Sequence, residues 1–514
     1  AIGASIFASN IGSEHLIGLA GAGASSGMAM AHWEIQGWMI LILGWVFVPF
    51  YSRSMVYTMP EFLERRYNPQ SRTILSVISL VSYVLTKVAV TVYAGGLVFQ
   101  QVFGIKELWG IDFFWIAAIG LVVLTALYTI FGGMKSVLYT SVLQTPILLL
   151  GSLIILVLGF KELGGWDEMM RVCGAVTVND YGDTMTNLIR SNDDANFPWL
   201  GALIGSAIIG FWYWCTDQFI VQRVLSGKNE KEARRGTIFG AYLKLLPVFL
   251  FLIPGMIAFA LHQKYIGAGG EGFLPMLANG TANADAAFPT LVAKLLPAGV
   301  KGLVVCGILA ALMSSLASLF NSSAMLFTID FYKRFRPETP EKKLVGIGQI
   351  ATVVIVILGI LWIPIMRSVG DVLYTYLQDV QSVLAPGIAA AFLLGICWKR
   401  TSAQGGMWGL IAGMIIGLTR LGAKVYYSNA GEVADSTFKY LFYDMNWLFF
   451  CGWMFLFCII VVIVVSLATE APTAEKIQGL VFGTATKEQK AATRASWDHW
   501  DIIHTVIILA ITGA

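Results

Sequence analysis

The stretch GASIFASNIGSEHLIGLAG, residues 3–21, places polar groups in the middle of an apolar run. Its polar part, residues 8–15, brings Asn10, Glu14 and His15 together with two serines and a glycine. A membrane helix interrupted in this way leaves backbone N–H and C=O groups unpaired, which is tolerated only where they line a cavity or are buried in protein. The alternative is a face of small residues that packs against another helix. We predict a broken membrane helix at a binding site.

The composition of the whole chain also requires a membrane. Of its 514 residues, 57% are hydrophobic and 13% are charged, against roughly 45–50% and about 25% in soluble domains. These values exclude a single soluble core, and a net charge of +3 is too small to indicate a nucleic-acid partner. The six cysteines show no disulfide or zinc pattern.

Apolar runs predict thirteen spans, near residues 1–24, 27–50, 74–103, 112–131, 141–160, 198–222, 236–263, 286–331, 346–366, 371–397, 405–423, 445–467 and 500–514.

Two loops set the predicted orientation. Residues 161–197 hold three basic and seven acidic side chains, a net charge of −4, whereas residues 223–235 hold five basic and two acidic ones, a net charge of +3. Because short loops rich in Lys and Arg stay in the cytoplasm, the first loop is predicted to be extracellular and the second cytoplasmic. Residues 1–160 and 198–397 then form two units of five spans with opposite orientation, and residues 398–514 form accessory helices.

This topology predicts an all-α polytopic protein with a five-plus-five inverted-repeat transporter fold and extra flanking helices. The alternative is that the two units are unrelated. Any block with an odd number of spans reverses the membrane orientation of the block that follows it, even without a repeat. In inverted-repeat transporters the solute and ions bind near the midplane, where the first helix of each unit is broken. In the second unit the counterpart of residues 8–15 is WYWCTDQ, residues 212–218. The alternative interpretation of these residues is a belt of aromatic side chains at the membrane interface.

Ionisable side chains inside apolar runs are expensive in hydrocarbon and mark either a pathway or a buried pair. Glu34 lies in MAHWEIQGW and Lys244 lies in YLKLLP, although either side chain could instead extend to the membrane interface. Lys87, in VLTKVAV, is interpreted as the partner of a neighbouring group. Gln378 adds a polar side chain near the start of the tenth span. These residues are the candidates for solute recognition.

Serines in the span 286–331 indicate a cation site. Ser314 and Ser315 are adjacent, so they point about 100° apart on a helix. Together with carbonyl oxygens from an unwound helix segment, their hydroxyls provide neutral oxygen ligands that can bind a sodium ion. Ser318 and Ser322 are better explained by hydrogen bonds to carbonyls one turn earlier.

Two further motifs favour structural roles. GASSG, residues 23–27, matches G-x-S-x-G but joins two apolar runs and lacks the preceding strand of a hydrolase. A repeated GxxxG pattern favours close helix contact and comprises Gly405, Gly409, Gly413 and Gly417.

The chain resembles the sodium/glucose cotransporters of the solute:sodium symporter family, nearly end to end. The shared motifs follow the same order: GASIFASNIGSEHLIGLAG, YTMPEFLERRY, a GG-x(3)-V-x(2)-T-x(3)-Q pattern over 132–144, WYWCTDQFIVQR, YLKLLP, ALMSSLASLFNSSAMLFTIDFY and PGIAAAFLLGICWKR. The resemblance implies a LeuT-like transporter of fourteen helices in the plasma membrane, not an enzyme. We therefore expect one helix upstream of residue 1.

The resemblance also implies roles for individual residues. The solute would lie among Asn10, His15, Glu34, Tyr213, Trp214, Lys244 and Gln378. Tyr213 would form the inner gate, while Trp33 and Tyr374 would cover the outer side. The co-transported sodium would be held by carbonyls of Ala8, Ile11 and Ala311 and by hydroxyls of Ser314 and Ser315.

Two departures keep the cargo open. Glucose-transporting relatives often carry a hydroxyl or amide at the position of Gly210 and an Asp at that of Ser141. We expect sodium-driven uptake of a hexose by alternating access, with inositol, mannose, sialic acid or another small organic solute as alternatives. An amino acid, nucleobase or carboxylate is a further alternative cargo, and an intramembrane enzyme using Glu34 or Ser25, or a channel, is less favoured. Sodium stoichiometry and oligomeric state stay open.

Overall fold

The computed structural model describes residues 2–12, 14–56, 58–277, 280–369, 373–429 and 434–513, without the side chains of residues 8, 9, 128, 130–145 and 366–369. Within these ranges, ten helical segments are long and apolar enough to cross a membrane. They are Glu14–Ser54, Pro69–Phe103, Pro146–Leu163, Trp199–Thr216, Glu230–Gly267, Ala298–Phe335, Glu341–Ile365, Leu373–Cys397, Ala403–Asn429 and Trp447–Ala468. The predicted class, a mostly helical protein with many spans, is confirmed.

Several membrane segments contain π-helical turns, labelled η here, with η2 and η7 being 3₁₀ turns instead. Up to residue 174 the elements are α1 (Ile2–Asn10), η1 (Glu14–Leu19), α2 (Ala20–Ser26), η2 (Gly27–Met30), α3 (Ala31–Glu34), α4 (Gly37–Ile42), η3 (Leu43–Phe47), α5 (Val48–Ser54), α6 (Met59–Arg66), α7 (Pro69–Ser82), η4 (Tyr83–Val88), α8 (Ala89–Phe103), β1 (Glu107–Leu108), β2 (Ile111–Asp112), α9 (Phe113–Leu163) and α10 (Trp166–Gly174). The antiparallel pair β1–β2 is a small addition to the predicted all-helical fold.

The second predicted unit and the C-terminal region are helical as well. The unit contains α11 (Trp199–Gly210), η5 (Phe211–Thr216), α12 (Gln218–Leu225), α13 (Glu230–Leu243), η6 (Val248–Leu252), α14 (Ile253–Gly267), η7 (Ala284–Ala286), α15 (Ala287–Leu295), α16 (Ala298–Met325), η8 (Leu326–Tyr332), α17 (Lys333–Phe335), α18 (Glu341–Val369) and α19 (Leu373–Cys397). It is followed by α20 (Ala403–Asn429), α21 (Thr437–Lys439), η9 (Tyr440–Asp444), α22 (Trp447–Ala468), α23 (Ala474–Ile477), α24 (Lys487–Ala495) and α25 (His499–Gly513).

Both predicted helix breaks are present. In the first, α1 ends at Asn10 and the chain bends at Ile11 and Gly12 before η1 begins at Glu14. In the second, η5 ends at Thr216, and Asp217 takes an extended conformation with φ −75° and ψ 126°. The Asp217 side chain caps α12 by accepting the N–H of Phe219 at 3.2 Å. Each break interrupts a helix inside the helix packing, as in transporters that bind their solute near the midplane.

One predicted loop is replaced by helix. We expected separate spans at 112–131 and 141–160, but α9 is a continuous helix of 51 residues, Phe113–Leu163. The connecting residues GGMKSVLYT contain no proline and one charge, so nothing in them forces a helix to end. A glycine pair destabilises a helix by only about 1 kcal/mol per residue. The predicted division of this part of the chain into spans therefore differs from the structure.

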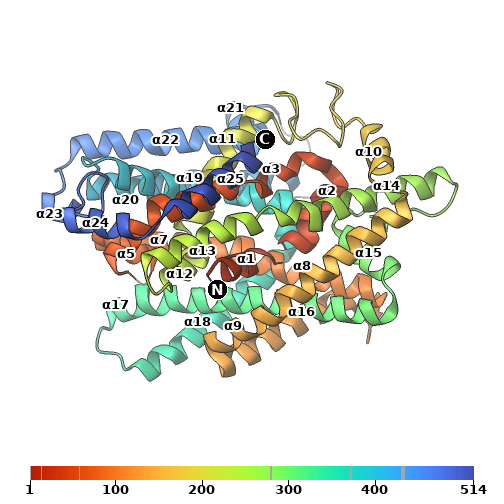
Figure 1. Ribbon diagram of the computed structural model, residues 1–514, viewed down its shortest axis with the longest axis horizontal. Coiled ribbons are helices and arrows are strands. Elements are labelled where there is room, and N and C mark those ends of the chain that lie inside the picture. The colour runs from red at the N-terminus through yellow and green to blue at the C-terminus, as the bar shows by residue number, and fades with distance from the viewer. Residues whose placement is uncertain are drawn as a thin grey trace.

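The helices form two main groups, with α1 lying between them (Figure 1). One contains α19, α20 and α22, and the other contains α9, α16 and α18. The predicted glycine ladder lies in the first group, where Gly413 of α20 faces Gly387 of α19 so closely that an added Cβ would lie 2.6 Å from the Gly387 Cα. Large apolar side chains are exposed along α9, α18 and α22, as expected for helices that face lipid.

Candidate functional site

One pocket between the two helix breaks collects most of the predicted solute-binding residues. It is lined by Asn10, Glu14, His15, Trp33, Gln36, Ile209, Gly210, Tyr213, Trp214, Lys244, Tyr374, Leu377, Gln378 and Gln381. Six of the seven predicted solute ligands and all three predicted gate residues are in this set. The seventh, Glu34, lies immediately behind the wall of the pocket.

Glu34 is the centre of a buried polar network. Its side chain is fully buried, and its Oε2 lies 2.6 Å from Lys244 Nζ and 3.3 Å from His15 Nε2. Its other oxygen, Oε1, accepts the Tyr374 hydroxyl at 3.0 Å. The carboxylate therefore orients three pocket residues that come from three separate parts of the chain. A buried charge is tolerated only when it is paired and hydrogen-bonded in this way.

A second set of contacts links the first break to the second. The Tyr213 hydroxyl donates to Asn10 Oδ1 at 3.2 Å, and Asn10 Nδ2 lies 3.3 Å from His15 Nε2. Lys244 Nζ lies 5.5 Å from the centre of the Trp214 ring. The pocket thus combines amide, imidazole, ammonium and phenol groups with flat aromatic surfaces.

Three buried polar atoms of pocket residues have no hydrogen-bond partner within the described part of the chain. They are His15 Nδ1, Trp33 Nε1 and Gln378 Oε1. Buried polar atoms are rarely left unpaired in native proteins. These groups are therefore suited to a ligand that carries several hydrogen-bonding groups around a compact body.

Gln36 was not predicted as a site residue. Its Nε2 donates to the Ser206 carbonyl of α11 at 3.1 Å, and a Cβ added to Gly210 would lie 2.5 Å from its Oε1. The amide of Gln36 thus occupies the space that a side chain at position 210 would need. Its position two residues after Glu34 in an apolar run was the available sequence signal.

The first break touches α16 at Ser315, one of the predicted sodium ligands. A Cβ on Gly12 would lie 2.7 Å from Ser315 Oγ, and this buried hydroxyl has no hydrogen-bond partner among the described residues. Ala311, Ser314 and Ser315 are spaced i, i+3 and i+4 on α16, so they share one helix face. Ile11 is buried at the bend itself. The side chain of Ala8 lies outside the described part of the chain, and its backbone belongs to α1.

Lys87 pairs with Asp217 at the second break, which confirms the prediction that this lysine pairs with a neighbouring group. Lys87 Nζ lies 2.7 Å from Asp217 Oδ2, and the Tyr83 hydroxyl donates to Asp217 Oδ1 at 2.9 Å. The ammonium also lies 5.0 Å from the centre of the Tyr213 ring. The pair therefore lies beside the predicted inner gate.

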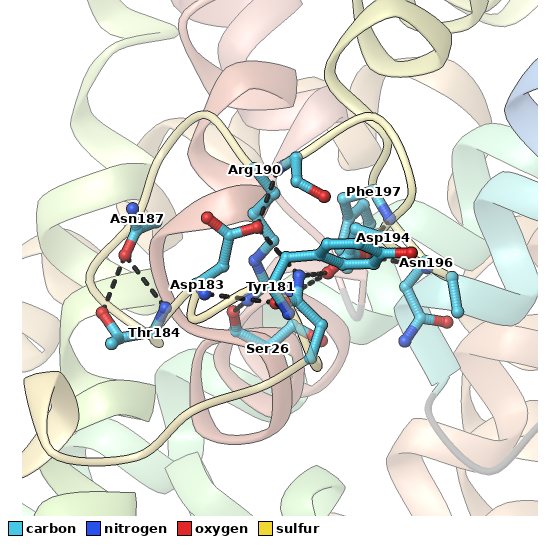
Figure 2. Close-up of polar contacts among 12 residues, drawn as sticks. Ser26, Tyr181, Asp183, Thr184, Asn187, Arg190, Asp194, Asn196 and Phe197 are labelled. Atoms are coloured by element: carbon cyan, nitrogen blue, oxygen red, sulfur yellow. Dashed lines mark hydrogen bonds and ion pairs between the residues drawn. The ribbon is translucent and has the colours of Figure 1, made fainter.

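The predicted extracellular loop contacts the end of α2 through Arg190 (Figure 2). Arg190 contacts the Ser26 carbonyl at the end of α2, lies 3.5 Å from Asp194 Oδ2, and covers the Phe197 ring at 5.6 Å. The Phe197 ring lies in turn 6.3 Å from that of Trp33. The loop thus reaches the predicted outer gate.

Hydrogen bonds inside this loop fix its shape. Asn179 Nδ2 donates to Asp183 and to Asp194, both at 2.8 Å, and the Ser191 N–H donates to Asp183 at 2.7 Å. The bonds from Asn179 and Ser191 stabilise the ionised carboxylate, so the pKa of Asp183 lies below its usual value.

The sequence of the chain is similar to those of known cotransporters. Residues 1–413 match the model of the Sodium:solute symporter family. The chain is 36% identical over 496 residues to sodium/myo-inositol cotransporter 2 of Homo sapiens, with 94% of this chain and 72% of that protein covered. It is 39% identical over 487 residues to sodium/glucose cotransporter 1 of Ovis aries, with 91% and 72% covered.

Two solved structures share the fold. A Na⁺-coupled sialic acid symporter in a substrate-bound outward-open state aligns with a TM-score of 0.67 at 20% identity, covering 92% of this chain and 90% of that one. MhsT in complex with L-phenylalanine aligns with a TM-score of 0.51 at 11% identity, covering 91% and 97%. The chain therefore has a LeuT-like transporter fold.

Proposed function

Because the chain belongs to the sodium:solute symporter family, and is thus a multi-span sodium-coupled solute transporter rather than an enzyme, we propose that its cargo is a hexose of the glucose or galactose type. The observation that carries this proposal is the network on Glu34, which holds Lys244, His15 and Tyr374 around one pocket. We also propose that the protein acts in the plasma membrane.

The chemistry of a sugar matches the groups in the pocket. A hexose carries hydroxyls around its rim, each able to donate and accept hydrogen bonds, and its ring faces are weakly apolar. Asn10 and Gln378 provide amides for the rim, Lys244 provides a charged donor, and Tyr213 provides an aromatic surface. Charge-assisted hydrogen bonds of this kind are stronger than neutral ones. Glu34 neutralises Lys244, which argues against an anionic cargo.

myo-Inositol is the second candidate cargo. Its ring of hydroxyls presents the same kind of rim as a hexose, and a sodium/myo-inositol cotransporter is among the similar proteins at 36% identity. Glucose-transporting relatives often carry a polar side chain at the position of Gly210. The glycine therefore keeps myo-inositol as an alternative cargo.

Sodium is proposed to bind where the first break meets α16, with carbonyls of Ala8, Ile11 and Ala311 and hydroxyls of Ser314 and Ser315. An ion that bridges these elements would favour the outward-open state and so expose the solute site. Trp33 and Tyr374 would then close the outer side, and Tyr213 would open the inner side. One sodium ion crossing about 100 mV supplies roughly 2.3 kcal/mol, and a tenfold gradient adds about 1.4 kcal/mol, enough to concentrate a sugar ~500-fold.

Uptake into proteoliposomes tests the proposal. The purified protein is given an inward sodium gradient and labelled glucose, galactose, mannose, myo-inositol or sialic acid, with a potassium gradient as the control. We expect saturable uptake of a hexose under sodium and none under potassium. A preference for myo-inositol would establish the second candidate, and sodium-driven uptake of sialic acid alone would contradict both.

A further inference from the structure

Glu14 lies between the proposed cation site and the solute pocket. It is the first residue of η1, directly after the first break, and it lines the pocket with Asn10, His15 and Tyr213. A Cβ on Gly12 would lie 2.7 Å from Glu14 Oε2 and also 2.7 Å from Ser315 Oγ. Glu14 Oε2 and Ser315 Oγ are therefore no more than twice 2.7 Å, or 5.4 Å, apart.

We propose that Glu14 supplies an anionic oxygen to the cation bound at the first break and thereby joins the sodium site directly to the solute pocket. This inference rests on the proposed sodium-coupled function and changes its ligand set, because the predicted site contained only hydroxyls and carbonyls. Ca²⁺, a hard cation, binds oxygen at about 2.3–2.6 Å, so an ion of this kind can contact two oxygens up to about 5 Å apart, which covers all but the outer end of the range allowed here. The hydroxyl of Ser315, buried without a partner among the described residues, is the second ligand.

The charges around Glu14 are compatible with this role. Glu14 interacts electrostatically with the Lys87 ammonium and the Tyr213 hydroxyl. Lys87 is itself paired with Asp217 at 2.7 Å, so this ammonium is shared between the two carboxylates. Because Glu14 also lines the pocket, ordering its side chain by sodium shapes the solute site, which gives a local contribution to coupling.

Two measurements on the full chain test the inference. The first is the rise in unfolding temperature of the detergent-purified protein as NaCl replaces choline chloride at constant ionic strength, without solute. The second is the sodium concentration for half-maximal hexose uptake in proteoliposomes. The variants are Glu14→Gln, Glu14→Asp, Ser315→Ala and the double Glu14→Gln/Ser315→Ala. Glu168→Gln, whose partner Arg171 lies on the exposed surface, is the matched control.

We expect Glu14→Gln to raise the half-saturating sodium concentration at least tenfold in both assays, and Glu168→Gln to leave it unchanged. If the two residues share one ion, the double variant will be weakened less than the product of the single effects. If Glu14→Gln does not fold, Glu14→Asp carries the test with an expected three- to tenfold rise.

Sodium dependence within twofold of the wild type, together with at least a tenfold rise in solute KM, would overturn the inference and make Glu14 a solute ligand. Wild-type protein that shows no sodium response in either assay would instead refute the proposed function itself. The two failures are therefore distinguishable.

Discussion

Lys87 Nζ and Asp217 Oδ2 lie 2.7 Å apart, and this ion pair joins η4 to the residue at which the second broken helix is interrupted. The side chains of the pair are only 4% and 2% exposed. The Phe219 ring lies 3.7 Å from the ammonium. The Lys87 ammonium is thus a permanent cation at the second break. At the first break, by contrast, a sodium ion is proposed to bind and leave.

Lys87→Ala is expected to lower the free energy of unfolding by about 3–5 kcal/mol, because it leaves Asp217 buried without its cation. The double variant Lys87→Met/Asp217→Asn should recover part of that loss, since it removes both charges. Thermal unfolding followed by tryptophan fluorescence measures the effect, with Arg65→Ala, from an exposed pair with Glu61, as the control. Equal stability of Lys87→Ala and Arg65→Ala would show that the pair does not hold the break.

Lys244→Ala and Gln378→Ala are each expected to weaken solute binding. Loss of a charge-assisted hydrogen bond at Lys244 should raise the solute KM by roughly 10- to 100-fold, and loss of a neutral one at Gln378 by roughly 3- to 10-fold. Initial rates of sodium-driven uptake over a range of solute concentrations provide the measurement. If both variants keep the wild-type KM, the pocket is not the transport site.

The sequence was sufficient to predict both breaks and most of the pocket, for a physical reason. Charged and polar side chains in apolar runs are too expensive to occur without a partner or a ligand, so Glu34, Lys244 and Gln378 stood out. The sequence could not identify which groups meet across the fold. The pairing of Lys87 with Asp217, 130 residues apart, depends on how η4 packs against the second break.

Other features lacked a distinct signal. Glu14 was part of the predicted break but was not assigned to the cation site, because its closeness to Ser315 depends on the bend at Gly12. Gln36 appeared as one more polar residue, since its contact with α11 joins positions 170 residues apart. In α9, two separate apolar runs predicted two spans, but packing against α8 and α16 accommodates a continuous helix.

Ser315→Ala is expected to raise the half-saturating sodium concentration by roughly 3- to 10-fold, because one hydroxyl ligand is lost. The maximum rate at saturating sodium should change little. Ser318→Ala, one turn further along α16, is the matched control, because its hydroxyl is predicted to bond to a carbonyl of the same helix. The prediction fails if both variants respond to sodium alike.

Gly210→Ser is expected to change the ranking of sugars, because the new side chain would displace the Gln36 amide that lies 2.5 Å from its Cβ position. We expect the KM for the preferred solute to rise about tenfold, with a smaller change for solutes that differ at the hydroxyl facing Gln36. The double variant Gly210→Ser/Gln36→Ala relieves the clash and should regain part of the affinity. Competition of labelled hexose uptake by a panel of sugars measures the ranking, and an unchanged ranking in Gly210→Ser would remove Gln36 from the specificity determinants.

Arg190→Ala is expected to speed release of bound solute to the outside. Arg190 ties the extracellular loop to Ser26 and covers Phe197, whose ring contacts Trp33 at the proposed outer gate. Without the guanidinium, buried Asp194 loses its counter-charge and the loop loses its anchor on α2, so closed states become less favourable. We expect release of labelled sugar from sodium-loaded protein to become roughly 3- to 10-fold faster, as a change of about 1 kcal/mol would give. Arg171→Ala, from an exposed pair in α10 of the same loop, should release solute at the wild-type rate. A loss of thermal stability in Arg190→Ala with unchanged release would show that the loop supports the fold without acting on the gate.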